Sequence, residues 1–107
     1  MNKNRIKLLE KYIEDDPEDP FNKYALAMEY HDEAPETATE ILSTLQKSHK
    51  DYLPLYFKLA HLYWEEEQYE EAEFIFETGI ELAEQQNDEK ALKELKAAYL
   101  NFDFDKP

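Results

Sequence analysis

The sequence contains no cysteine and only one glycine, Gly79, among its 107 residues. Without cysteine the chain can form no disulfide, no thiolate zinc site and no thiol nucleophile. With a single glycine, tight β-hairpins are hard to build and a phosphate-binding glycine loop is excluded. The composition therefore favours helices over strands.

Basic residues are scarce beside acidic ones, since 12 Lys and Arg stand against 26 Asp and Glu, for a formal net charge of -14. Such a charge repels nucleic acid and anionic membrane surfaces. Residues 1–16 carry charged groups every few positions and lack the apolar run of a signal peptide or a membrane span. We therefore expect a cytoplasmic protein that binds neither nucleic acid nor membranes.

A pattern of apolar residues recurs along the chain. Three of its members recur 33 residues later, as the pairs Leu26 and Leu59, Ala27 and Ala60, Tyr30 and Tyr63. Three more recur 34 residues later, as the pairs Ala38 and Ala72, Leu42 and Phe76, Leu45 and Gly79. The change from 33 to 34 places a one-residue deletion in the turn near Pro35, where deletions are best tolerated.

Within each repeat the spacing is that of a pair of helices. Tyr56, Leu59, Ala60 and Tyr63 fall at i, i+3, i+4 and i+7, which is one face of a helix. A second helix follows Gln68-Tyr69, with the small residues Ala72 and Gly79 at positions where two helices could approach closely. Caps and prolines mark the expected starts at Asp19-Pro20, Pro35, Pro54 and Asn87-Asp88. We predict helices over residues 2–15, 20–32, 36–48, 53–66, 69–86 and 88–101.

The second repeat resembles the tetratricopeptide repeat signature. The matching residues are Tyr56, Leu59, Ala60 and Tyr63, then Tyr69, Ala72, Phe76 and Gly79. The first repeat departs from the signature at Lys23, where an aromatic residue is preferred. The resemblance implies an all-α, right-handed superhelix of about six antiparallel helices. It divides a single domain of residues 1–107 into a half repeat (1–17), a first repeat (20–52), a second repeat (53–86), a capping helix (88–101) and a tail (102–107).

The first helix of each predicted repeat carries a second apolar face. Phe21, Tyr24 and Met28 form this face in the first repeat, and equivalent positions form it in the second. In proteins of the family that this chain resembles, these positions line a concave groove that holds a peptide. We therefore predict a partner site made of Phe21, Tyr24, Met28, Phe57, His61, Trp64 and Lys93. Its expected occupant is a protein or peptide that is apolar with basic residues, because the acidic rim of the groove attracts positive charge.

Other uses of these residues remain open. Aromatic stripes at helical spacing also occur as plain core packing. The alternating segment from Leu100 to Phe104 could fold over the groove or insert into a second copy, which would make the protein a self-assembling scaffold or homodimer. One subfamily binds a partner's terminal carboxylate through paired Lys and Asn residues, but this chain has Tyr24 and Met28, then Phe57 and His61, at those positions.

No pattern in the sequence indicates catalysis. His61 and Glu65 lie at i and i+4, yet zinc takes three or four ligands and no HExxH motif is present. The run Glu65-Glu66-Glu67 is typical of a solvated helix face, and no serine stands in a nucleophile motif. We predict a non-catalytic adaptor with no cofactor and no metal site.

Overall fold

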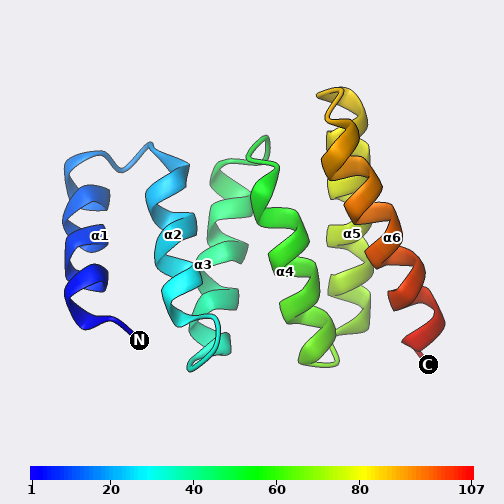
Figure 1. Cartoon of the computed structure of the whole chain (residues 1–107), viewed down its shortest axis with the longest axis horizontal. Helices are drawn as coiled ribbons and strands as arrows, with labels where there is room; N and C mark the ends of the chain where they lie inside the picture. The colour runs from blue at the N-terminus through cyan, green and yellow to red at the C-terminus, as the bar shows by residue number, and fades with distance from the viewer. The chain divides into compact units, whose positions relative to one another are not determined.

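The computed structural model describes all 107 residues and contains six α-helices joined by short turns (Figure 1). They are α1 (Lys3–Asp15), α2 (Pro20–Tyr30), α3 (Pro35–Ser48), α4 (Pro54–Glu65), α5 (Tyr69–Gln85) and α6 (Glu89–Asp105). The chain forms no β-strand, so the all-α prediction is confirmed. None of the helices combines the length and the apolar character needed to cross a membrane.

Local sequence explains where the helices begin. Proline occupies the first turn of α2, α3 and α4, where its missing N–H would have had no helical acceptor. Side-chain caps mark the starts of α1, α2 and α6, where an oxygen of Asn2, Asp19 or Asp88 accepts a hydrogen bond from a free backbone N–H, so α2 carries both signals.

The last helix extends further than the sequence analysis predicts. It continues to Asp105, whereas the predicted capping helix ends at residue 101 and gives residues 102–107 to a tail. The physical reason is Phe102, which is fully buried and shares a helix face with Leu95 and Ala98. Burying this ring requires the helix to continue, so the predicted start of the tail is wrong.

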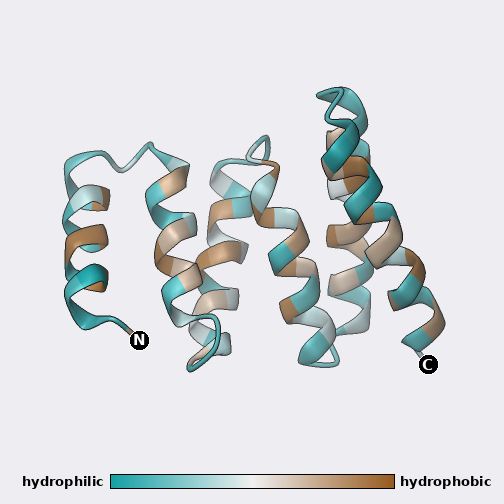
Figure 2. Ribbon diagram, viewed as in Figure 1, coloured by the Kyte–Doolittle hydropathy of each residue, from teal (hydrophilic) through white to brown (hydrophobic).

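The six helices form two compact units, Met1–Tyr52 and Leu53–Pro107. In the first unit α2 packs against both α1 and α3, and in the second unit α5 packs against both α4 and α6. Hydrophobic residues recur along each helix while the turns are mostly hydrophilic, as the brown and teal segments of Figure 2 show. The predicted single domain and right-handed superhelix stay predictions.

Apolar side chains of the repeat pattern form the centre of each unit. In the first unit Ala27, Ala38, Leu42 and Leu45 are buried between α2 and α3, and Ile6 and Leu9 of α1 are buried beside them. In the second unit the fully buried residues include Tyr56, Leu59, Ala60, Ala72, Phe76 and Phe102. No buried side-chain nitrogen or oxygen lacks a hydrogen-bond partner. These cores fix the faces of α2, α4 and α6 that remain for other contacts.

Candidate functional site

The predicted partner-site residues fall into two groups, one in each unit. Phe21, Tyr24 and Met28 lie on α2 in the first unit, whereas Phe57, His61 and Trp64 lie on α4 in the second. Lys93 lies on α6, also in the second unit, and is exposed. That the two groups line one continuous groove stays a prediction.

The group in the first unit is partly packed and partly open. The Phe21 side chain is 59% exposed, whereas Tyr24 and Met28 are half-buried. The Tyr24 ring meets the Tyr52 ring edge to face, with the ring centroids 5.8 Å apart. Burial raises the pKa of Tyr24 and is also the largest cause of the raised pKa of Tyr52. Tyr24 therefore contributes both to packing and to the surface, and Phe21 contributes mainly to the surface.

In the second unit Phe57, His61 and Trp64 form an aromatic ladder along α4. The ring centroids of Phe57 and His61 are 4.3 Å apart, and those of His61 and Trp64 are 5.6 Å apart. His61 Nδ1 donates a hydrogen bond to the Phe57 carbonyl oxygen at 2.7 Å, which holds the imidazole against the helix and leaves Nε2 for other contacts. All three side chains are partly exposed. The structure thus brings these predicted residues together.

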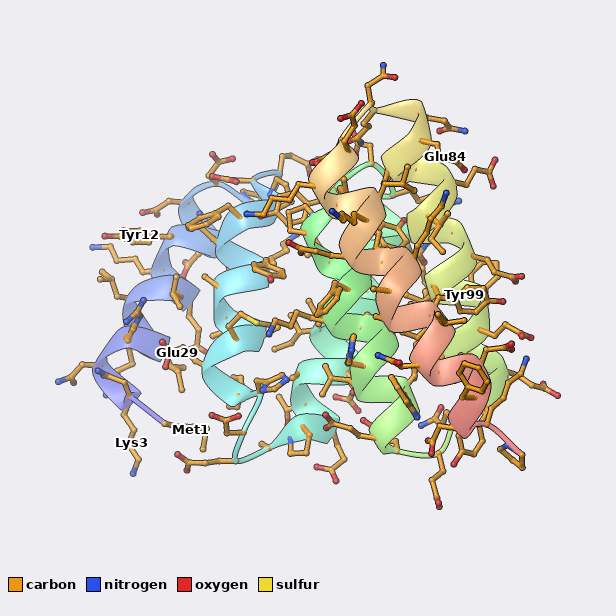
Figure 3. All side chains as sticks on the ribbon, turned by 45° about the vertical axis from the view of Figure 1, so that its right-hand side comes forward. Met1, Lys3, Tyr12, Glu29, Glu84 and Tyr99 are labelled. Carbon is orange, nitrogen blue, oxygen red and sulfur yellow. The ribbon has the colours of Figure 1, made fainter.

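Behind the ladder lies the aromatic core of the second unit. The Phe76 ring meets the His61 ring at 5.7 Å and the Trp64 ring at 6.3 Å, in both cases edge to face. Tyr99, labelled on α6 in Figure 3, lies close to Phe76. The centroids of the two rings are 5.6 Å apart, and the Tyr99 hydroxyl donates a hydrogen bond to Glu77 of α5. The ladder is therefore supported from behind by fixed rings.

The final turn of α6 holds Trp64 in place. Trp64 Nε1 donates a hydrogen bond to Asp105 Oδ2 at 2.6 Å, and the Phe102 ring meets the indole edge to face at 5.5 Å. Lys106 Nζ closes the same end of the helix by pairing with Glu73 at 2.5 Å and Asp103 at 3.1 Å. Sequence reasoning missed Asp105 as a partner of Trp64, because 41 residues separate the two and no motif links them.

A cavity of about 400 Å³ opens beside the Trp64 end of the ladder. It is lined by His61, Trp64, Glu65, Glu67, Tyr69 and Asp105. Three of these residues carry carboxylates and none is Lys or Arg, so the cavity is negative. The pKa of the Tyr69 hydroxyl is raised, first by desolvation and then by the charges of Glu67 and Asp105. The arrangement can accept a positively charged group that also packs against aromatic rings.

The cavity is shaped by the turn between α4 and α5. Glu67 has a φ of 60°, the left-handed conformation that commonly ends a helix. Its N–H donates to the Trp64 carbonyl oxygen at 3.0 Å, and the next N–H, of Gln68, donates to the Tyr63 carbonyl oxygen at 2.9 Å. This closed turn places Glu65 and Glu67 on the rim of the cavity. No three His, Asp or Glu side chains lie close enough together to hold a metal ion.

Comparison with known proteins identifies similar sequences and folds. Residues 53–86 match the family model described as tetratricopeptide repeat. A solution NMR structure of a tetratricopeptide repeat domain protein from Salinibacter ruber is similar, with a TM-score of 0.75 and 34% identity over 81% of this chain and 89% of that chain. A crystal structure of a tetratricopeptide repeat domain protein from the same organism has a TM-score of 0.75 and 31% identity, over 79% of this chain and 96% of that chain. No protein of curated function matches the sequence.

Proposed function

This chain belongs to the tetratricopeptide repeat family, and from that premise we propose that it is a non-catalytic adaptor that binds a peptide or partner protein through the aromatic faces of α2 and α4. The resemblance read from the sequence is confirmed by the family model and by the solved structures. Members of this family are in general protein interaction modules, so a polypeptide is the expected ligand.

The observation that carries this proposal is the aromatic ladder. Phe57, His61 and Trp64 stack along α4, partly open to solvent and backed by the fully buried Phe76. Rings held this way lose little conformational entropy when a partner covers them, and they offer a large apolar area. Phe21, Tyr24 and Met28 give α2 a second surface of the same kind, and Lys93 supplies a hydrogen-bond donor on α6.

The cavity beside Trp64 indicates what the partner carries. Glu65, Glu67 and Asp105 make it negative, while Trp64 and Tyr69 give it aromatic walls. A lysine or arginine side chain fits both features, because its charge meets carboxylates and its stem or guanidinium plane packs on a ring. We therefore propose that the peptide has apolar residues for the ladder and a basic residue for the cavity.

The experiment uses a displayed library of random peptides, panned against the intact chain. We expect the selected peptides to combine apolar residues with Lys or Arg. Their binding is then measured by the fluorescence of Trp64, which is the only tryptophan and hence an unambiguous reporter. Replacing the basic residue of a selected peptide with citrulline or glutamine should weaken binding by roughly tenfold.

Two variants test whether the selected peptides bind the ladder in particular or any exposed aromatic ring. Phe57→Ala removes one ring of the ladder and should weaken the binding of the selected peptides by roughly tenfold or more. Phe74→Ala removes a phenylalanine that is 59% exposed on α5, outside the proposed surface, and should leave binding unchanged. Selection of acidic peptides, or equal binding by the Phe57→Ala variant, would contradict the proposal.

A further inference from the structure

The side of α6 that faces away from the core of its unit carries an apolar stripe. The stripe starts at the charged Lys93 and continues with the apolar Ala97, Leu100 and Phe104. The intervals are four, three and four residues, so the four side chains line up along one helix face. All four are exposed, with Leu100 at 58% and Phe104 at 84% of their surface. The opposite face of the same helix is buried through Leu95, Ala98 and Phe102.

This stripe differs from the usual outer face of a surface helix. A helix face that stays in contact with water is normally polar or charged. Here the outer face exposes a leucine and a phenylalanine one turn apart, and most of the surface of each side chain is open to solvent. The spacing is the seam of a two-stranded coiled coil, in which apolar residues alternate at intervals of three and four.

Charged residues beside the stripe identify its occupant. Lys96 and Asp103 lie on the same flank of the stripe, seven residues apart, and both are exposed. If a second α6 packs antiparallel along the stripe, Lys96 of each copy lies opposite the partner's Asp103, so the ion pair forms twice. A parallel partner would place the uncharged Asn101 near Lys96 instead. The helix is therefore complementary in charge to an antiparallel copy of itself.

We propose that two copies of this chain form a twofold-symmetric dimer through the Lys93 to Phe104 stripe of α6, with the two helices antiparallel. The small Ala97 lets the helices approach near the twofold axis, where it faces the partner's Leu100. At each end Phe104 packs on the alkyl stem of the partner's Lys93. Lys93 is the one residue that this stripe shares with the proposed peptide surface. Neither the aromatic ladder nor the cavity beside Trp64 contributes to the stripe, so the two proposals can be tested separately.

The first test is light scattering coupled to size exclusion on the full chain, from micromolar to millimolar concentration. The expected mass is about twice the 12.8 kDa of one chain. Phe104→Glu should reduce it to that of a single chain, since the charge would stand in the apolar seam. Phe74→Glu is the matched control, because Phe74 is also exposed but lies on α5, and it should leave the mass unchanged. Circular dichroism should show native helix content in both variants.

The second test addresses the antiparallel arrangement. Lys96→Asp and Asp103→Lys should each raise the dimer dissociation constant by roughly tenfold, and the double variant should restore it. Within one chain the two residues are separated by about 10 Å along the helix axis, so restoration requires a second copy. Asp103 also pairs with Lys106 of its own chain, and Lys106→Met, which removes that pair together with the one to Glu73, should leave the dimer intact.

Three results would overturn the dimer. They are a single-chain mass for the wild-type protein at every concentration, an unchanged dimer mass for Phe104→Glu, and a double charge variant no better than the single ones. None of these results bears on peptide selection by the aromatic ladder, so failure of one proposal is distinguishable from failure of the other.

Discussion

Replacing Gly79 with alanine sets helix propensity against helix packing. Gly79 lies in the middle of α5 and is buried where this helix crosses α4. A Cβ atom added there would lie 2.8 Å from Tyr56 Cβ, 3.3 Å from Tyr56 Cγ and 3.4 Å from Leu95 Cδ1. The first of these is a non-bonded distance that Cβ atoms in proteins essentially never show.

The magnitude follows from two opposing effects. Alanine in a helix interior is favoured over glycine by about 1 kcal/mol. Against this, carbon atoms pack at about 3.5 to 4.0 Å, so α4 and α5 would have to separate by roughly 0.7 Å or more. Tyr56 cannot turn away, because its Cβ is bound directly to the backbone and its side chain is fully buried. Overpacking of this kind costs up to about 3 kcal/mol. We expect a net loss of about 2 kcal/mol in the free energy of unfolding.

The assay is urea denaturation, followed by circular dichroism and by the fluorescence of Trp64, which reports on the second unit. The propensity difference is measured at Glu81, an exposed position in the same helix, where alanine should be more stable than glycine by about 1 kcal/mol. If Gly79→Ala is as stable as the wild-type protein or more so, the close approach of α4 and α5 does not limit packing and the reasoning fails.

Two further predictions concern the end of α6 and the tyrosines of the first unit. Phe102→Ala should lower the free energy of unfolding by about 3 to 5 kcal/mol because Phe102 is fully buried, whereas Phe104→Ala should change it by less than about 0.5 kcal/mol at protein concentrations low enough to keep the chain monomeric. Equal urea midpoints for the two variants would contradict this. Because burial raises the pKa of Tyr24 above 10.0, its contribution to stability is complete below that pH and is lost as the pH rises through the higher pKa of the folded state. Tyr24→Phe cannot ionise, so its stability should fall less steeply above pH 10.0 in urea titrations, and identical slopes would argue against the burial effect.

The helices and their buried faces could be predicted because the signals for them are local. Tyr56, Leu59 and Ala60 have helical spacing in the sequence, and all three are fully buried in the structure. The small residue Gly79 was expected where helices approach closely, and the distance to Tyr56 confirms that approach. Such features are fixed by the periodicity of a single segment, so they can be recognised before any contact between segments is known.

The end of α6 could not be predicted, because the local pattern there is ambiguous. Phe102 and Phe104 alternate with Asp103 and Asp105, which fits an extended segment as well as a helix. What decides between them is a contact between distant parts of the chain, namely the Phe102 ring against Trp64 and Phe76. Periodicity within the segment carries no information about that contact.

The candidate site could be predicted only in part. Phe57, His61 and Trp64 could be placed on one face of a helix from their spacing, and the ring distances confirm that they are neighbours. The cavity beside them was not foreseen, because it needs the left-handed turn at Glu67 and the carboxylate of Asp105. That Phe57, His61 and Trp64 bind a partner stays a prediction.

The final turn of α6 contributes residues to both proposed surfaces. Successive residues of a helix point about 100° apart, so one turn can serve three surroundings at once. Phe102 points into the core, Phe104 points to solvent on the stripe, and Asp105 reaches Trp64 at the cavity. Unwinding this turn would remove a core ring, a seam residue and a cavity wall together. The burial of Phe102 therefore supports two proposed features at once, the cavity through Asp105 and the stripe through Phe104.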